Sequence, residues 1–319
     1  MVNVGLYFDL RSPDRDWARA YAFALELCEE ADRLGAASVW FSEHHGFDDG
    51  YLPQPLTFAA AVAARTSRVR IGTAVLVAPF RHAAHVAEEA AVVDLVSGGR
   101  LDLGLGGGYR AAEFALFGAD RSRRLASTVD LARSVRRLWA GGEVTPAPAQ
   151  SRMPFWLGFA GPRGARAAGT LGEGLLSLDP ALVAPYREGL AAAGHDPAAA
   201  AMAGLLPAYP TDDPERDWPV VGRLHAAQWD SYGRHDVAGT DRPAPRPVDP
   251  ERSRARGLRP GPAGLLFDTP ENVAAAIRDH LTGVPADTVL LWARLPGQDE
   301  AMTAAHVRTI LTRLAPLLA

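Results

Sequence analysis

Short apolar runs alternate with longer segments of helical periodicity along this chain, and the alternation repeats about eight times. This is the pattern of βα units around a parallel sheet, because buried parallel strands are apolar on both faces. The first helical segment places Phe23, Leu27 and Ala31 on one face, and Gly35 is suited to end it. Strands are predicted at residues 2–8, 38–42, 69–77, 100–106, 154–159, 174–178, 201–209 and 287–293, and helices at 17–34, 56–65, 83–96, 125–139, 163–171, 269–281 and 302–314.

Eight such units favour an α/β fold of the (β/α)8 TIM barrel type, in which the strands close into a ring and the helices surround it. A barrel of this kind takes about 250 residues, so a chain of 319 residues leaves room for one insertion. Residues 234–262 are rich in Arg and Pro and lack helical or strand periodicity, and they are predicted to be this insertion. It would be a mobile lid or a solvated loop. The whole chain, residues 1–319, is expected to form one barrel domain.

The composition excludes several classes of function. All 33 basic residues are Arg, so no Lys is available for a Schiff base, a pyridoxal phosphate anchor or a P-loop. The formal net charge of -4 gives no basic field for nucleic acid or an anionic membrane, and a small-molecule substrate is expected instead. Cys28 is the single cysteine, so an intramolecular disulfide cannot form. The start of the chain does not read as a signal peptide, which favours a soluble, cytoplasmic protein.

Catalytic groups in a barrel lie at the carboxyl ends of its strands, and the first candidate cluster there is Glu43-His44-His45. Histidine is the side chain most often used to donate or accept a proton near neutral pH, so His44 and His45 are candidate catalytic residues. The alternative for each is a structural role at a strand end. A metal site is not expected, because the sequence lacks the HExxH spacing.

The second cluster is the glycine-rich segment 104–110, which follows the predicted fourth strand. Glycine lets the backbone approach a flat ligand closely, so Gly106 and Gly107 are candidate binding residues. A dinucleotide fingerprint is disfavoured, because GxGxxG requires glycine where Tyr109 stands. The alternative is a tight strand-to-helix turn that binds nothing.

The third cluster, residues 158–166, lies where the fifth strand gives way to a helix. Free amides at a helix N-terminus, glycines and guanidinium groups together favour a phosphate site, and an ordinary helix cap is the alternative. Arg124, next to Arg123 on the loop into the preceding helix, can add a bidentate contact. The candidates within the cluster are Ala160, Gly161, Arg163 and Gly164, with Arg166 as a further guanidinium.

A series of short motifs occurs along the chain in this order: Leu34-Gly35, Val39-Trp40-Phe41-Ser42-Glu43-His44-His45, Ile71-Gly72-Thr73, Ala87-Glu88, Asp94-Leu95-Val96-Ser97-Gly98-Gly99-Arg100, Leu103-Gly104-Leu105-Gly106, Glu113-Phe114, Phe117-Gly118 and Asp268-Thr269-Pro270-Glu271-Asn272-Val273. In the order and spacing of these motifs, the chain resembles the bacterial luciferase-like flavin monooxygenases, a family with a (β/α)8 barrel. The resemblance covers nearly the whole chain.

The resemblance implies an enzyme that takes reduced FMN from a separate flavin reductase and uses it with O₂ to oxygenate an organic substrate. The family's active-site histidine maps onto His44, with His45 as a second candidate. A non-proline cis peptide beneath the flavin ring maps onto Ala74-Val75. The family also implies a homodimer that forms through the helices after the second and third strands.

The chain departs from the luciferases at several positions. Gly106 and Gly107 stand where the luciferases have a cysteine and an arginine near the flavin, which argues against light emission. Gly161 and Gly164 replace hydroxyl-bearing phosphate contacts, so backbone amides with Arg163 or Arg166 would hold the phosphate. Aromatic residues near strand ends are expected to wall the site against water: Tyr7, Phe8, Trp40, Phe80, Trp156 and Phe159.

Three functions remain open at the level of sequence. As a monooxygenase, the enzyme would hydroxylate an activated carbon or insert oxygen beside a carbonyl in a Baeyer-Villiger-type reaction. Some similar barrels instead transfer hydride to a deazaflavin cofactor, but the complete Glu-His-His and Ser-Gly-Gly-Arg matches favour FMN. The third function is a non-catalytic flavin-binding protein, which the eight apparent βα units argue against.

Overall fold

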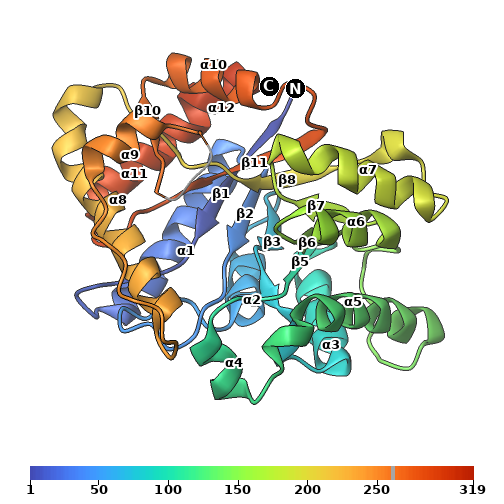
Figure 1. Cartoon of the computed structure of the whole chain (residues 1–319). Coiled ribbons are helices and arrows are strands. Elements are labelled where there is room, and N and C mark those ends of the chain that lie inside the picture. Colours follow the sequence, from blue (N-terminus) through green and yellow to red (C-terminus); the bar gives the residue numbers. More distant parts are fainter. Residues whose placement is uncertain (260–262) are drawn as a thin grey trace.

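The predicted apolar runs form parallel strands that close into a barrel (Figure 1). The computed structural model describes residues 1–259 and 263–319. Around the ring the order is β1 (Asn3–Phe8), β2 (Ser38–Phe41), β3 (Arg70–Thr73) with β4 (Leu76–Val77), β5 (Leu101–Gly106), β6 (Phe155–Gly158), β7 (Gly174–Leu176), β8 (Met202–Leu205) and β11 (Ala286–Trp292), which pairs again with β1. Because β3 and β4 both pair with β5, they together count as one of the eight strands of the ring. The described residues therefore confirm the (β/α)8 barrel.

Helices surround this ring (Figure 1). Asp16 caps the first helix by accepting a hydrogen bond from the Arg19 amide, and Gly35 ends it at a φ of 82°. The helices are α1 (Trp17–Leu34), α2 (Pro55–Arg65), α3 (Ala83–Ser97), α4 (Ala111–Phe117), α5 (Arg124–Gly141), α6 (Pro162–Leu171), α7 (Val183–Ala192), α8 (Pro214–Val237), α9 (Pro250–Arg256), α10 (Pro270–His280), α11 (Glu300–Thr309) and α12 (Ala315–Leu318). Among the described residues, no helix combines the length and the hydropathy needed to cross a bilayer.

Two tryptophans fill the interior of the barrel, so that ligands are accommodated at its rim. Trp40 of β2 and Trp156 of β6 meet edge to face, with ring centroids 6.2 Å apart. The indole of Trp40 occupies the space over Gly72 of β3, where an added Cβ would lie 2.3 Å from the ring. Interiors are packed too closely to absorb such a contact, and glycine is therefore required at position 72.

Two of the predicted strands are interrupted, and each interruption has a local cause. After Thr73 the predicted strand 69–77 breaks, because the Thr73 hydroxyl takes over the pairing with β5: it donates to the Gly104 carbonyl at 2.7 Å and accepts from the Gly104 amide at 2.9 Å. The predicted strand 201–209 breaks at Pro207, which has no amide hydrogen to donate. Its second half, β9 (Ala208–Pro210), pairs with β10 (Leu266–Asp268) in a separate two-stranded sheet.

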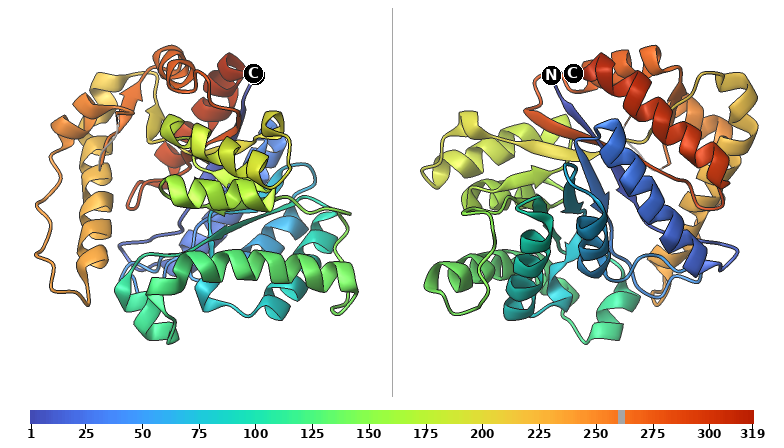
Figure 2. Two further views of the ribbon diagram at one scale, coloured as in Figure 1. Left: turned by 45° about the vertical axis from the view of Figure 1, so that its right-hand side comes forward. Right: turned by 180° about the vertical axis from the view of Figure 1, so that it is seen from behind.

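The prediction of an insertion without helix or strand at 234–262 is wrong in two respects: its first residues belong to a helix, and a second helix lies within it. Residues 234–237 end the long helix α8, and residues 250–256 form α9. Asp249 starts α9 by accepting hydrogen bonds from the Glu251 and Arg252 amides. Residues 238–249 run back beside α8 without helix or strand (Figure 2). Residues 260–262 of the predicted insertion lie outside the described residues.

At the opposite, amino-terminal end of the strands, Arg100 joins three elements. Its guanidinium donates to the carbonyls of Ala63 (3.0 Å), Thr66 (2.9 Å) and Val69 (2.8 Å), at the end of α2 and the start of the following chain. It also donates to the Ser97 carbonyl at 2.7 Å, where α3 ends. The Ser-Gly-Gly-Arg motif therefore has a structural role, because a cation beside the last carbonyls of a helix stabilises its end.

Candidate active site

His44 stands directly beyond the carboxyl end of β2, and its two ring nitrogens have different environments. Nδ1 lies 2.8 Å from Glu113 Oε1, on α4. Nε2 lies 3.4 Å from the Tyr109 hydroxyl, at the long limit of a hydrogen bond. The side chain is largely buried, and its backbone amide donates to the Leu52 carbonyl at 3.2 Å. The loop after β2 and the helix α4 together fix the orientation of the imidazole.

Glu113 determines which nitrogen of His44 carries the proton. Burial raises the pKa of Glu113, but the hydrogen bonds from His44 and from the His45 amide, together with the charge of Arg110, outweigh burial and hold that pKa below its ordinary value. The carboxylate is therefore ionised at neutral pH and accepts the proton of His44 Nδ1. We assign the proton of neutral His44 to Nδ1 from this network, which leaves Nε2 with a free lone pair.

Arg110 ties this pair to α8. Its guanidinium donates to Glu113 Oε1 at 3.0 Å, to the His45 carbonyl at 2.7 Å and to the His235 carbonyl near the end of α8 at 3.0 Å. The His235 ring stacks on Phe47, with centroids 3.8 Å apart. The end of α8 is thus attached to the segment that carries His44.

His45, the second predicted catalytic histidine, lies behind His44. Its Nε2 is 2.8 Å from Glu43 Oε1, and its ring packs against Phe117, with centroids 4.6 Å apart. Glu43 in turn accepts hydrogen bonds from Arg81 at 2.9 Å and from the Val77 amide at 3.0 Å. His45 is not among the described residues that line the two cavities beside His44. Its contacts are those of a residue that holds the β2 loop to β4.

A cavity of about 540 Å³, here called the barrel-mouth cavity, opens at the carboxyl ends of the strands. His44 lies on its wall. The cavity brings together seven of the nine residues predicted to bind the cofactor, namely Ala74, Val75, Gly107, Arg124, Ala160, Arg163 and Gly164. Gly106 and Gly161 are not among the described lining residues. Of the predicted aromatic wall, Tyr7 and Phe159 line the cavity, while Trp40 and Trp156 fill the barrel beneath it.

Gly106 influences this cavity through Val75. The peptide bond between Ala74 and Val75 is cis, as predicted, and the Val75 side chain lies against β5 and β6. An added Cβ on Gly106 would lie 2.3 Å from Val75 Cγ2, and one on Gly158 would lie 2.5 Å from Val75 Cγ1. The two glycines therefore provide the space that allows Val75 to form part of the cavity wall.

The first turn of α6 supplies polar donors to the barrel-mouth cavity. Gly161 precedes the helix at a φ of 83° without a side-chain cap, and Pro162 takes the first helical position, where no amide hydrogen is needed. Arg163 and Gly164 of this turn line the cavity, and so does Arg124 of α5. Arg166 was predicted as a further guanidinium at the phosphate site, but it instead forms an exposed ion pair with Glu188 at 2.7 Å.

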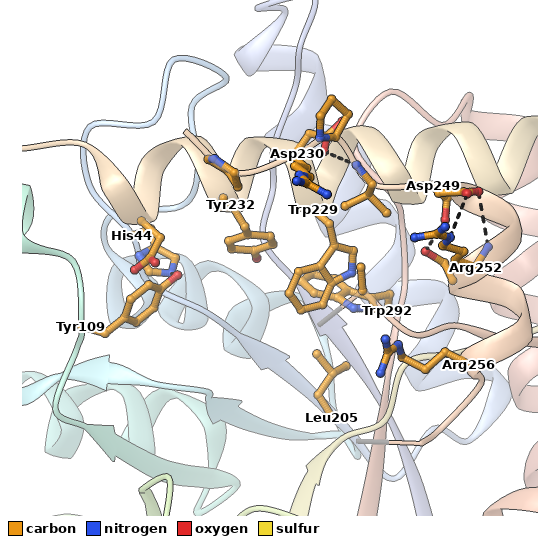
Figure 3. Close-up of a pocket in the computed structure, with 18 of the residues that line it drawn as sticks. His44, Tyr109, Leu205, Trp229, Asp230, Tyr232, Asp249, Arg252, Arg256 and Trp292 are labelled. Atoms are coloured by element: carbon orange, nitrogen blue, oxygen red, sulfur yellow. Dashed lines mark hydrogen bonds and ion pairs between the residues drawn. The ribbon is translucent and has the colours of Figure 1, made fainter. Parts of the chain in front are cut away.

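A second cavity of about 760 Å³, here called the α8 cavity, lies between the barrel and α8 (Figure 3). It shares Tyr7, His44, Tyr51 and Tyr109 with the barrel-mouth cavity. Burial raises the pKa of Tyr51 and of Tyr232 well above 10, so both phenols stay protonated at neutral pH. His44 therefore stands where the two cavities meet.

Sequence reasoning missed the partners of His44. Tyr109 belonged to the glycine-rich segment and Glu113 to a motif of the family resemblance, and nothing in their spacing showed that they would reach His44. Trp229 and Tyr232 come from α8, where no strand-end position marked them. Among the described residues, no three His, Cys, Asp or Glu side chains are grouped as around a metal ion.

The chain matches a known protein family along most of its length. Residues 8–288 match the family described as luciferase-like monooxygenase. Over 123 residues, 38% of this chain, the sequence is 36% identical to the oxygenase component of the flavin-dependent trigonelline monooxygenase of Acinetobacter baylyi, and the match covers 34% of that protein. Over 175 residues, 48% of this chain, it is 33% identical to the F420-dependent glucose-6-phosphate dehydrogenase of Amycolatopsis mediterranei, of which the match covers 52%. The chain thus spans about a third and about half of the length of these two relatives.

A solved structure extends the similarity over the full length. The fold superimposes on the monooxygenase RslO1 of Streptomyces bottropensis with a TM-score of 0.83 and 26% sequence identity, and the alignment covers 100% of both chains. Since the family match spans most of the barrel and the fold agrees along the whole chain, this protein belongs to the luciferase-like monooxygenase family.

Proposed function

We propose that this chain is the oxygenase component of a two-component monooxygenase that uses reduced FMN and O₂ to oxygenate a small organic substrate. The observation that carries the proposal is the position of His44 on the shared wall of two cavities. The barrel-mouth cavity would hold the flavin, and the α8 cavity would hold the substrate. A proton donor or acceptor between two bound molecules is what an oxygen-transfer reaction requires.

The residues of the barrel-mouth cavity fit FMN. The guanidinium groups of Arg124 and Arg163 and the first-turn amides of α6 form a donor set for a phosphate, at the positive end of a helix dipole. Ala74, Val75 and Gly107 are uncharged residues of the wall and suit a flat ring system, and the Arg124 side chain lies beside Gly107. When bound, reduced FMN would supply the two electrons with which O₂ gives one oxygen atom to the substrate and one to water.

His44 would hold or move a proton at Nε2, because Glu113 retains the proton at Nδ1. The aromatic bodies of Tyr7, Tyr109 and Phe159 line the barrel-mouth cavity and would exclude water from the reaction. Both hydroxylation and Baeyer-Villiger-type insertion are compatible with this arrangement, since each needs a proton to be delivered or removed near the reacting oxygen.

The proposal includes a partner, a compartment and an oligomeric state. A separate flavin reductase would deliver reduced FMN in the cytoplasm. A homodimer is supported by α3, which exposes Val92, Leu95 and Val96 on one face, with exposed fractions of 47%, 45% and 51%. Residues at positions i, i+3 and i+4 share one side of a helix, so these three form a continuous apolar strip.

The second candidate function is hydride transfer with a deazaflavin cofactor, which the similarity to an F420-dependent dehydrogenase favours. In that reaction His44 would exchange a proton with the alcohol or carbonyl group of the substrate. O₂ would take no part.

The test is to incubate the chain with FMN, a flavin reductase, NADH, ¹⁸O₂ and candidate ketones and aromatic compounds, followed by mass analysis. We expect a product that contains one ¹⁸O atom, an ester for Baeyer-Villiger insertion or an alcohol for hydroxylation. Reduction of F420 by an alcohol without O₂ consumption would favour the second candidate. If the chain bound neither FMN nor F420, both candidates would be wrong.

A further inference from the structure

We infer that the substrate is a flat aromatic carboxylate, which binds with its ring system between Tyr232 and Trp229 and its carboxylate at the arginine-bearing outer end of the α8 cavity. This inference rests on the proposed function, because it takes the α8 cavity as the substrate site. It names the class of molecule that the cavity recognises.

The α8 cavity is walled by aromatic rings along its length (Figure 3). From His44 the ring of Tyr232 lies 6.1 Å away, and the ring of Trp229 lies a further 5.8 Å along α8. Trp292 of β11 lines the same cavity and meets Tyr7 edge to face, with ring centroids 4.5 Å apart. Aromatic faces at these spacings favour planar ligands, since offset or edge-to-face ring pairs add to the apolar burial.

The hydroxyls of Tyr7, Tyr51 and Tyr232 and the indole nitrogen of Trp229 are already bound to protein. The Tyr7 hydroxyl donates to the Ala74 carbonyl at 3.1 Å, and Trp229 Nε1 donates to His225 Nε2 at 2.9 Å. The Tyr51 hydroxyl donates to Ser42 Oγ at 2.8 Å and lies 2.9 Å from the Tyr232 hydroxyl. Ring faces are therefore what this wall offers to a ligand, and a hydroxyl-rich molecule such as a sugar would gain few hydrogen bonds from it.

Asp249, Arg252 and Arg256 lie at the outer end of the cavity, away from His44 (Figure 3). Asp236 also lines the cavity and is paired with Arg242 at 2.9 Å. Asp230 accepts from the Val248 amide at 2.8 Å and makes no ion pair with a described residue, and Asp249 accepts from the amides of the first turn of α9. Arg246 also lines the cavity and makes no ion pair with any described residue, while Arg252 has only an exposed pair with Asp249 at 3.5 Å. An incoming carboxylate would find the guanidinium of Arg246, which no described carboxylate occupies.

Size agrees with this assignment. A volume of about 760 Å³ falls within the range of roughly 300 to 1,000 Å³ that holds drug-sized ligands. A ligand whose carboxylate lies beside Arg252 and whose rings extend past Trp229 would direct its opposite edge towards His44. The reacting carbon is therefore placed at the end of the ring system remote from the carboxylate.

The test measures binding by calorimetry without flavin, with three matched probes: anthracene-2-carboxylate, its neutral carboxamide, and the fully saturated tetradecahydroanthracene-2-carboxylate. We expect the aromatic acid to bind about fivefold more tightly than the amide, from its charge. We expect it to bind about tenfold more tightly than the saturated acid, from ring contacts. Equal affinity for the aromatic and saturated acids, equal affinity for acid and amide, or no binding of any probe would each overturn the inference.

Two sets of variants locate the contacts. The double variant Arg246→Gln/Arg252→Gln should abolish the preference for acid over amide, whereas Arg133→Gln/Arg137→Gln, which alters two exposed arginines of α5, should retain it. Trp229→Leu should weaken binding of both aromatic probes about tenfold, and Trp229→Phe should retain most of the affinity. An unchanged probe preference in the Arg246/Arg252 double variant would also overturn the inference.

Failure of this inference can be distinguished from failure of the proposed function. The probes are bound without cofactor or turnover, so a negative result leaves the ¹⁸O experiment unaffected. Conversely, a chain that bound anthracene-2-carboxylate and did not bind FMN would retain the substrate class and lose the proposed monooxygenase activity.

Discussion

At the scale of single residues, the central feature is the asymmetry of His44. One ring nitrogen is committed to Glu113, and the other faces the cavities beside Tyr109. The histidine itself was predictable, because it follows a strand end in a recognisable motif. Glu113 was not predictable as its partner, since 69 residues separate the two and the contact depends on how α4 folds back over the loop after β2.

His44→Ala should lower kcat of substrate oxygenation by about 10², because a positioned acid or base contributes a factor of this order. The measurement is steady-state turnover with saturating FMN and reductase. His195→Ala, which changes an exposed histidine after α7, is the control and should match the unmodified chain. Normal turnover in His44→Ala would remove His44 from the mechanism.

Gly106→Ala should weaken FMN binding about tenfold, even though Gly106 does not line the cavity, because the new methyl group would displace Val75. Fluorescence titration of FMN measures the effect. The double variant Gly106→Ala/Val75→Ala should recover most of the affinity, since it removes the side chain that is displaced. Wild-type affinity in the single variant would contradict this account of the wall.

At the scale of elements, the barrel strands and the helices of regular period were predictable from apolar periodicity. The helices α4, α7 and α8 were not predicted. The helix α8 carries Pro219 and a polar sequence, and it packs against the segment after β2 through the contacts of Tyr232 with Tyr51 and of His235 with Phe47. The helix α9 was hidden by an Arg- and Pro-rich composition, although Asp249 and Pro250 are a helix start in retrospect.

The helix α11 should make the stability of the fold sensitive to acid. His306 of α11 stacks on Tyr209 with ring centroids 3.6 Å apart, and burial lowers its pKa to about 4. Since the unfolded chain binds this proton near pH 6.5, the folded state loses stability as the pH falls from 6.5 to about 4, by on the order of 3 kcal/mol. Chemical denaturation across this range should show a shallower loss in His306→Gln than in the wild type. The exposed variant His85→Gln is the control, and equal slopes in His306→Gln and the wild type would refute the assignment.

At the scale of the whole molecule, the proposed homodimer depends on the apolar strip of α3. Leu95→Asp should convert the dimer into a monomer, because it places a charge between Val92 and Val96. In a two-fold symmetric interface the charge would be introduced by both protomers. Analytical ultracentrifugation gives the mass directly. Val220→Asp, at an exposed valine of α8, should leave the mass unchanged. A monomeric wild-type chain would show that the strip has another use.

The hydrogen bonds that Arg100 makes to the ends of α2 and α3 affect how such proteins are classified. The Ser-Gly-Gly-Arg motif is part of the family resemblance, yet it joins elements at the amino-terminal end of the barrel, and Arg100 is not among the described residues that line the barrel-mouth cavity or the α8 cavity. A motif of this kind identifies the fold but not the reaction, because the loops at the carboxyl ends of the strands can change while the amino-terminal end of the barrel stays the same. Oxygenases and dehydrogenases can therefore share the same motif, and they are distinguished by the side chains at the carboxyl ends of the barrel strands.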